Sequence, residues 1–508
     1  MMQESTAGKH TYGQILKSSA MIGGSSVVSI AIGIIRTKAM AVLLGPAGVG
    51  LLGLYGSIAD LAASVAGMGV NSSGVRQVAE AAGSGDRGRI ARTAIVLRRT
   101  SLALGLISIV LLVALSEPIA VLTFGGNQHA AGVALLSLAV FFRLMSEGRA
   151  ALLQGTRRIA DLAKMGVLGA FFGTLISIPL VYFFREDGVV PSLVLGAAMT
   201  LVTALWYASK VEIQATSMTA SQVGKELSAL LKLGSAFMAS GVMMMGVAYA
   251  IRIFVTREVG IDAAGLYQCA WAVGGLYVGL ILQSMGADFY PRLTAVAQDD
   301  TECNRVVNEQ AQVSLLLAAP GVLATLTFAP LVISLLYTAQ FAEAVPLLRW
   351  LCLGVALRVI SWPMGYIIIA KGNQRLFFLS EAAWTVVHVG LAWICVRSFG
   401  LNGAGMAFFG SYVFHVFMIY AIVRRLSGFR WSMENAKTGL SSLLLVGLVF
   451  WGFSALSPLL ATVLGAVAVA STSVYSLRAL LGLGSLDRIP RPLLRLLVCC
   501  RLATPSAK

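Results

Sequence analysis

Charged residues are scarce in this chain of 508 residues, and acidic residues are scarcer than basic ones. Only 12% of the residues are charged, with 22 Asp and Glu against 38 Lys and Arg, whereas 57% are hydrophobic and the mean hydropathy is +0.83. A membrane-spanning helix needs about 20 mostly apolar residues, and such runs follow one another from residue 15 to residue 482. The composition excludes a soluble domain and predicts an all-α polytopic membrane protein.

Catalytic and metal-binding motifs are also missing. The six cysteines show no CxxC or Cys/His spacing, and the chain has no GxSxG, Walker or HExxH motif. No loop on the predicted cytoplasmic side is long enough for an ATPase or glycosyltransferase domain. We therefore expect a protein that is not an enzyme, with no metal site and no cofactor. The N-terminal stretch MMQESTAGKHTYGQILKSS lacks a signal-peptide pattern, so the first span itself is expected to insert.

The net charge of +16 would suggest a nucleic-acid partner in a soluble protein. Here the Lys and Arg residues are instead concentrated in the loops on one predicted side of the membrane. With the N-terminus inside, the cytoplasmic segments between the fourteen predicted spans hold 28 of the 38 Lys and Arg, and the opposite loops hold only Arg185, Arg257 and Arg397. The positive-inside rule places both termini in the cytoplasm, and no nucleic-acid partner is expected.

Two stretches of the chain match two later ones at an offset of 215 residues. ILKSSAMIGGSSVVS from Ile15 lies over LLKLGSAFMASGVMM from Leu230, and GPAGVGLL from Gly45 lies over GIDAAGLY from Gly260. Each copy contains six predicted spans, so we predict two six-helix bundles related as a parallel repeat around a central cleft, plus two extra C-terminal transmembrane helices at the periphery. The predicted domains are a cytoplasmic N-terminus (1–14), an N-terminal six-helix bundle (15–215), a cytoplasmic linker (216–229), a C-terminal six-helix bundle (230–426), two additional transmembrane helices (427–482) and a basic cytoplasmic tail (483–508).

A few cations interrupt the apolar runs, where a charge costs at least ~2.5 kcal/mol by insertion scales. Arg252 lies within GVAYAIRIFV, and the repeat aligns it with the region of Arg36 and Lys38. A guanidinium in a wet cleft binds phosphate oxygens in a bidentate manner. We predict that these three residues and Arg358 bind an anionic substrate. The alternative is that they snorkel to the headgroup layer or pair with acids inside the membrane.

Four acids lie within the predicted spans: Asp60, Glu147, Asp288 and Glu381. Carboxylates at this depth can carry coupling protons or bind Na⁺, and Asp60, Asp288 and Glu381 are the candidates. Each is equally suited to be the salt-bridge partner of a nearby arginine. Arg143 and Glu147 are four residues apart on one helix and are expected to pair.

Several stretches match the pattern of a known family in order along the chain. LLGPAGVGLLG (43–53) is similar to a first external turn, YAIRIFVTREVG (249–260) to a seventh helix with an embedded arginine, and DFYPRLTAV (288–296) to the end of an eighth. The longest match runs from YIIIAKGNQRLFFLSEAAW (366–384) into GLNGAGMAFFGSYVFHVFMIYAIVRRL (400–426). Over roughly residues 12–426 the chain resembles the Wzx-type O-antigen and lipid III flippases of the MOP exporter superfamily.

The resemblance implies a flippase that moves an undecaprenyl-diphosphate-linked oligosaccharide, an O-antigen or related repeat unit, from the cytoplasmic to the outer leaflet of a bacterial inner membrane by alternating access. In that family cleft cations bind the headgroup, which matches Arg252 best and Arg36 and Lys38 next. Its acids are linked to H⁺ or Na⁺ coupling, as proposed for the three candidates above. The implied partners are the lipid-linked oligosaccharide, membrane lipids, and the polysaccharide polymerase with its chain-length machinery.

The two extra helices depart from the twelve spans of typical O-antigen flippases. Peptidoglycan lipid II flippases have fourteen spans and arginines in their first helix, so they are the alternative. Multidrug exporters of the same superfamily bind cations, which suits a cleft rich in arginine poorly. Two alternatives of other classes are a polymerase that acts on the same lipid and a membrane scaffold that transports nothing. A polymerase would be expected to carry a large external loop with catalytic arginines. A scaffold would not need Arg252, so this residue distinguishes a scaffold from a transporter.

Overall fold

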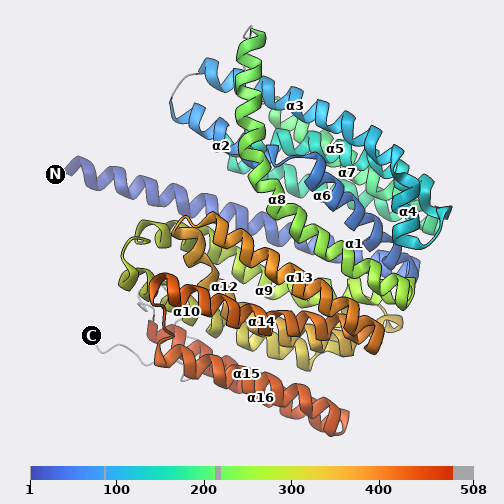
Figure 1. Cartoon of the computed structure of the whole chain (residues 1–508), viewed down its shortest axis with the longest axis vertical. Coiled ribbons are helices and arrows are strands. Elements are labelled where there is room, and N and C mark those ends of the chain that lie inside the picture. The colour runs from blue at the N-terminus through green and yellow to red at the C-terminus, as the bar shows by residue number, and fades with distance from the viewer. Residues whose placement is uncertain (1, 85–86, 212–218, 484–508) are drawn as a thin grey trace. The chain divides into compact units, whose positions relative to one another are not determined.

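The computed structural model describes the backbone of residues 2–84, 87–211 and 219–483, and the side chains in these ranges except those of residues 2–23, 87, 220–221, 236–237, 280 and 283–288. This part of the chain is almost entirely helical (Figure 1). Its α-helices are α1 (Met2–Ala66), α2 (Val70–Gly83), α3 (Arg87–Ala114), α4 (Ser116–Phe124), α5 (Ala130–Gly155), α6 (Ile159–Phe184), α7 (Val189–Ala208), α8 (Ala220–Glu258), α9 (Ile261–Ala295), α10 (Asp300–Thr327), α11 (Ala329–Leu336), α12 (Ala344–Ala370), α13 (Gln374–Phe399), α14 (Leu401–Ser427), α15 (Met433–Ala455) and α16 (Pro458–Leu483). Residues 484–508 of the predicted basic tail lie outside the described residues.

Eleven described helical stretches are long and apolar enough to cross a membrane, which makes the chain a multi-pass membrane protein. Two of these stretches, 24–66 and 159–208, each overlap two of the fourteen predicted spans. The predicted eighth span coincides with α9, some of whose side chains are not described. The prediction of an all-α polytopic protein is confirmed. The helix α8 begins at Ala220, inside the segment predicted as a linker, where Thr219 and Gln222 form a capping box.

The helix α1 contains a sharp break that divides it into two spans. Gly45 has φ 65° and ψ −169°, and Pro46 follows it. Glycine adopts this backbone conformation without the penalty of a Cβ, and proline lacks the N–H that a continuous helix would use. A second break follows α1, where Met68 and Gly69 have φ 46° and 62°. The predicted second span, near residues 48–75, is therefore interrupted between Ala66 and Val70.

The described contacts divide the chain into two compact units, of which the first contains residues 1–265 and 336–338. Its core includes fully buried Leu54 on α1, Leu136 and Val140 on α5 and Val189 on α7. The helix α8 belongs to this unit, although the predicted second bundle begins at residue 230. The domain bounds 15–215 and 230–426 stay predictions, because contacts within the chain do not test an ancestral repeat.

The second unit contains residues 266–335 and 339–508. Helices α10, α12, α13 and α14 pack together, and their core includes buried Met364, Ile367 and Val423. The two extra helices, α15 and α16, are present and pack against α10, with a smaller contact between α15 and α12. The guanidinium of Arg349 on α12 lies 3.5 Å from the ring centroid of Phe453 on α15, so a cation–π contact helps to hold α15 in place.

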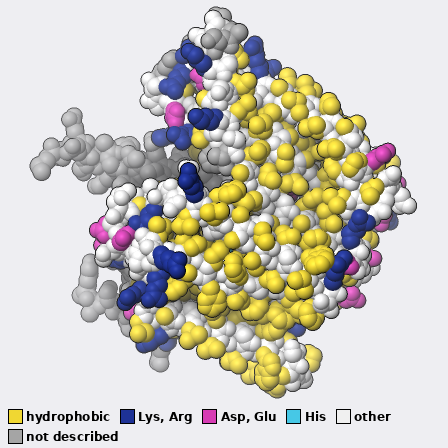
Figure 2. All heavy atoms as spheres, viewed as in Figure 1, with side chains coloured by type: hydrophobic (Ala, Val, Ile, Leu, Met, Phe, Trp, Pro, Cys, Tyr) yellow, Lys and Arg dark blue, Asp and Glu magenta, His cyan; other side chains and the backbone are white. Residues whose placement is uncertain are grey.

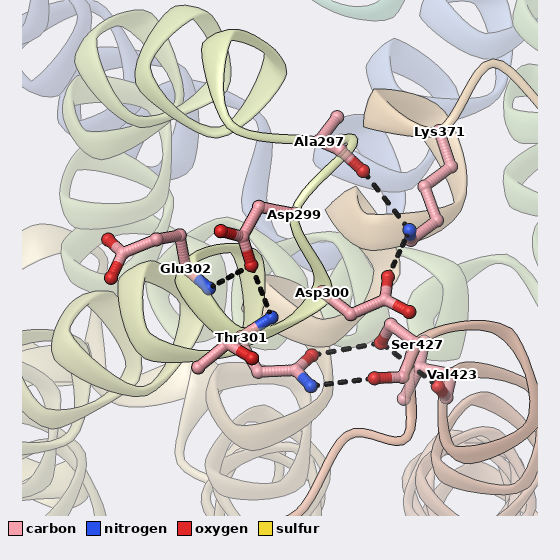
Figure 3. Close-up of polar contacts among 9 residues, drawn as sticks. Ala297, Asp299, Asp300, Thr301, Glu302, Lys371, Val423 and Ser427 are labelled. Atoms are coloured by element: carbon pink, nitrogen blue, oxygen red, sulfur yellow. Dashed lines mark hydrogen bonds and ion pairs between the residues drawn. The ribbon is translucent and has the colours of Figure 1, made fainter.

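A polar cluster ties together four helices of the second unit at one end (Figure 3). The Nζ atom of Lys371, after α12, donates to the carbonyl oxygen of Ala297 at 3.1 Å and forms an ion pair with Asp300 at the start of α10. Asn304 on α10 donates to the carbonyl oxygen of Ser427 at 2.7 Å, and the Ser427 hydroxyl donates to Asn304 Oδ1 at 2.9 Å. These contacts fix the predicted cytoplasmic ends of α9, α10, α12 and α14 relative to one another.

Apolar side chains cover much of the outer surface of the helices. Figure 2 shows a broad hydrophobic area in which few charged side chains appear, with Lys and Arg gathered at its margins. Large exposed apolar side chains include Phe183, Leu335, Phe417 and Leu459, each at least 70% exposed. Such large apolar patches are not typical of water-soluble proteins, so this surface is suited to contact lipid chains.

Candidate functional site

Arg36 lies on the first half of α1, and its guanidinium has no partner among the residues that the structure describes. Its Nε atom is buried without a hydrogen bond. Lys38, half a turn further on, donates from Nζ to the carbonyl oxygen of Tyr337, in the segment 336–338 of the same unit. Of the two cations predicted on this helix, Lys38 therefore donates to the protein backbone, whereas Arg36 has N–H donors available for a ligand.

Arg252 lies on α8, within the first unit. It is 9% exposed, and among the described residues no other Lys, Arg, Asp or Glu is as buried. Tyr249 and Ile253, on neighbouring positions of α8, pack into the core of this unit. One guanidinium nitrogen of Arg252 donates to the carbonyl oxygen of Ala248 at 3.0 Å, and the side chain takes part in a further interaction. The protein itself therefore positions this arginine.

Two helix turns that the predicted repeat aligns with each other make reciprocal contacts within the first unit. A Cβ at Gly50 would overlap the carbonyl oxygen of Ile261, and a Cβ at Gly265 would overlap that of Pro46. The two glycines are 215 residues apart, as are the two carbonyl groups. The contact thus has the reciprocal form that a pair of repeat-related turns would make, and it requires a glycine on each side.

These turns give a common reference for the depth of the three cations. Gly45 and Gly260 precede the two contact segments and both have positive φ. A helix rises 1.5 Å per residue, so Arg36, Lys38 and Arg252 lie about 10 to 14 Å along their helices from these glycines. The predicted cations of α1 and α8 therefore occupy one level of the first unit.

A cavity of about 420 Å³ lies inside the first unit, lined by residues of α1, α5, α6 and α7. Arg143 lies on its wall between two acids: its Nε donates to Glu147 Oε1 at 3.0 Å, and a terminal nitrogen pairs with Asp60. The predicted Arg143–Glu147 pair is confirmed, and Asp60 is a salt-bridge partner as the alternative interpretation predicts. Two carboxylates share one guanidinium, so a single bound proton would make this group neutral.

The remaining predicted residues lie in the second unit. Arg358 on α12 and Glu381 on α13 have no ion-pair partner among the described residues. The side chain of Asp288 lies outside the described residues. The structure thus places Arg36, Lys38 and Arg252 in one unit and Arg358 in the other.

Sequence reasoning missed a buried polar group in the second unit. His388 on α13 is 1% exposed, and neither of its ring nitrogens has a hydrogen-bond partner among the described residues. Trp384 lies beside it, with ring centroids 5.1 Å apart, and His415 in turn lies beside Trp384, with ring centroids 6.1 Å apart. The signal that could have found this group is the spacing of Glu381, Trp384 and His388, which places all three on one helix face.

Comparison of the sequence with known proteins finds a matching family and two similar proteins. A sequence profile described as "polysaccharide biosynthesis protein" matches residues 39–346, more than half of the chain. The lipid III flippase of Escherichia coli (strain K12) is 23% identical over 407 residues, which are 78% of this chain and 95% of that protein. The lipid III flippase of Shigella flexneri matches over the same length with the same identity.

Solved structures with a similar fold are membrane transporters. A multidrug resistance MATE family transporter of the MOP superfamily, in an inward-facing conformation, has a TM-score of 0.65 at 16% identity, covering 79% of this chain and 98% of that chain. The lipid II flippase MurJ, in an inward closed conformation, has a TM-score of 0.61 at 12% identity, covering 90% and 99%. These likenesses show the fold: the predicted all-α, MOP-type arrangement of helices is confirmed, and the two-bundle repeat stays a prediction.

Proposed function

The chain belongs to the polysaccharide biosynthesis protein family, and from this premise we propose that it is a flippase for a polyprenyl-diphosphate-linked oligosaccharide. It carries the headgroup from the cytoplasmic to the outer leaflet of a bacterial inner membrane by alternating access, with both termini in the cytoplasm. The substrate is an O-antigen or related repeat unit, which a polysaccharide polymerase and its chain-length machinery then extend. No covalent step occurs on the protein.

The observation that carries this proposal is the guanidinium of Arg36, which has no partner among the residues whose side chains the structure describes. An arginine inside a membrane protein is costly, and such residues normally pair or line a functional pathway. Its Nε is buried without a hydrogen bond, so the free energy of burying the charge is not recovered within the described protein. A diphosphate offers the planar, bidentate acceptor that a guanidinium binds best.

Lys38 and Arg252 support the same interpretation from the same level of the first unit. Lys38 donates to the carbonyl oxygen of Tyr337 and Arg252 to that of Ala248, so the protein fixes the position of both cations. A sugar headgroup cannot cross hydrocarbon alone, because each unpaired polar group costs several kcal/mol there. Cations at one level of the helices lower that cost for a diphosphate, while the polyprenyl chain stays in the lipid.

The test is translocation of a fluorescent polyprenyl-diphosphate oligosaccharide in proteoliposomes. Losing one charge-assisted phosphate contact removes about 1.5–3 kcal/mol, so Arg36→Gln should weaken substrate affinity roughly tenfold to a hundredfold. Arg252→Ala should lower transport as well, with partial rescue by Arg252→Lys. The control is Arg478→Gln, which removes an exposed arginine on α16. Normal transport by Arg36→Gln and Arg252→Ala would refute the headgroup site, and an inactive wild type would refute the function.

Lipid II is the alternative substrate, because the lipid II flippase structure covers 90% of this chain. The same vesicles loaded with lipid II in place of the oligosaccharide lipid decide between the two. Faster transport of lipid II by the wild-type protein would replace the first proposal.

A further inference from the structure

The cavity of about 420 Å³ in the first unit is large enough to hold a ligand. It is lined by residues of α1, α5, α6 and α7, and Asp60, Arg143 and Glu147 lie on its wall. The side chains of these three residues, called the charged triad below, are 46%, 43% and 33% exposed. Small-molecule sites have volumes of ~300–1,000 Å³ and combine apolar walls with a few polar groups, so this cavity has the size and the lining of such a site.

The charged triad holds itself together and still offers acceptors to a ligand. Arg143 Nε donates to Glu147 Oε1 at 3.0 Å, and a terminal nitrogen of Arg143 donates to Asp60 Oδ1. Each carboxylate thus uses one oxygen for the guanidinium, and its second oxygen can accept a hydrogen bond. Ser146 and Thr200 also line the cavity, and their hydroxyl groups, which donate to backbone carbonyl oxygens, can accept as well. The cavity therefore suits a ligand with several hydroxyl donors.

The charge of the cavity disfavours ions of either sign. Two carboxylates against one guanidinium leave one net negative charge, and the other described residues that line the cavity are uncharged. A phosphate group would therefore be repelled, and Arg143 is already engaged by both acids. A metal ion is disfavoured because the guanidinium lies between the carboxylates, and no three His, Cys, Asp or Glu side chains in the described ranges could hold one together. A neutral molecule with hydroxyl groups suits the chemistry that remains.

Apolar side chains form much of the remaining wall. Ala59, Ala150, Leu193 and Ala197 line the cavity together with the charged triad. A sugar ring presents hydroxyl groups at its edge and C–H groups on its faces, so its two parts match the polar and the apolar parts of this lining. A Cβ at Gly56, which also lines the cavity, would meet nothing within 4 Å, so the wall leaves space for such a ring.

The depth of the charged triad suits a sugar that is attached to the proposed diphosphate. Arg36 precedes the break at Gly45 by nine residues, and Asp60 follows it by fifteen. Both halves of α1 lead from this break toward the predicted cytoplasmic side. At a rise of 1.5 Å per residue, Asp60 lies about 9 Å further along the helix direction than Arg36. The diphosphate-binding cations and the triad therefore occupy successive levels, as do the diphosphate and the sugars of one lipid.

We propose that this cavity binds a neutral sugar ring of the lipid-linked oligosaccharide, whose hydroxyl groups form hydrogen bonds with Asp60, Arg143 and Glu147. The inference rests on the proposed transport function and adds to it a sugar subsite distinct from the diphosphate-binding cations. A hexuronic acid in the same position would bring a second negative charge to the triad. The cavity therefore selects neutral sugars against acidic ones, by repulsion as well as by attraction.

The first test compares the binding of two lipids to the full-length protein in detergent. One is undecaprenyl diphosphate without sugar, and the other is the same lipid carrying the neutral disaccharide glucosyl-N-acetylglucosamine. The wild type should bind the disaccharide lipid about tenfold more tightly or better, which is the factor that one hydrogen bond to a charged group provides. Asp60→Asn and Glu147→Gln should weaken this lipid about tenfold and the sugar-free lipid much less. Glu80→Gln, which breaks an exposed Arg76–Glu80 pair of the same unit, is the matched control.

A second variant fills the cavity and leaves its charges in place. Gly56→Leu adds a side chain where a Cβ meets open space, and Gly447→Leu on α15 adds the same side chain at an equally open position of the second unit. Gly56→Leu should weaken binding of the disaccharide lipid about tenfold, whereas Gly447→Leu should not. Melting temperatures close to that of the wild type show that both variants are folded.

A third lipid tests the selection by charge. It carries glucuronic acid in place of glucose, and the wild type should bind it less tightly than the neutral disaccharide lipid. Asp60→Asn removes the net negative charge and should reduce this difference. Equal binding of the sugar-free and disaccharide lipids by the wild type, or equal weakening of both by the Asp60, Glu147 and Gly56 variants, would overturn the sugar site and leave the transport function intact. A wild type that binds none of these lipids would refute the proposed function itself.

Discussion

The reciprocal contact of Gly50 and Gly265 gives a sharp quantitative prediction. In Gly50→Ala and Gly265→Ala the new Cβ would lie closer than 3.0 Å to a backbone carbonyl oxygen, which cannot rotate away as a side chain would. Overpacking of this kind costs roughly 3 kcal/mol at the upper end of its usual range, and alanine returns about 1 kcal/mol of helix propensity. Each variant should therefore lower the free energy of unfolding by about 2 kcal/mol.

The double variant tests the reciprocal geometry itself. One small separation of the two turns would relieve both overlaps, so the second substitution should add much less than the first, with a coupling energy of about 0.5–3 kcal/mol. Thermal melting in detergent measures this, with an expected fall of roughly 4–8 °C for each single variant. The matched control is Gly246→Ala on α8, where a Cβ meets nothing within 4 Å. Single variants that melt with this control, or a double variant equal to their sum, would refute the reasoning.

Three further predictions concern side-chain contacts within single units. Arg143→Leu leaves Asp60 and Glu147 without their shared cation and should destabilise the protein by about 1–3 kcal/mol, since the cavity partly hydrates them; adding Asp60→Asn should restore part of the loss in a melting experiment. A double-mutant cycle of Arg349→Lys and Phe453→Leu should give a coupling energy of about 0.5–2 kcal/mol, and a value near zero would exclude an anchoring role in holding α15. Lys371→Met should lower the melting temperature, whereas Arg305→Ala, in an exposed ion-pair group, should leave it nearly unchanged.

Local patterns predicted much of the fold because they report contacts within one helix. The apolar runs predicted the spans and the two extra helices, and the spacing of Arg143 and Glu147 predicted their ion pair. The second partner of Arg143, Asp60, is 83 residues away along the chain, and no local pattern encodes that distance. The break at Gly45 has a local cause in the Gly–Pro sequence, but the placement of α8 in the first unit depends on packing between distant helices.

The candidate site was predicted less completely for the same reason. Embedded charges are conspicuous in an apolar sequence, so Arg36, Lys38 and Arg252 could be named, but whether each one is paired depends on backbone carbonyls that sequence does not place. His388 and His415 do not stand out as embedded charges do, because a single histidine in a helix is most often satisfied by its surroundings. Only the facing of α13 and α14 reveals that their nitrogens lack partners.

The Gly50–Gly265 contact also bears on how such a chain could arise. If the two halves descend from one six-helix ancestor, this contact would first have joined two identical subunits, each offering the same glycine to the same carbonyl oxygen of the other, as in any two-fold symmetric dimer. Any substitution of that glycine in the ancestor would have damaged the interface twice. After fusion into one chain the two positions can change independently, and the two halves are free to become unequal everywhere except at this shared contact.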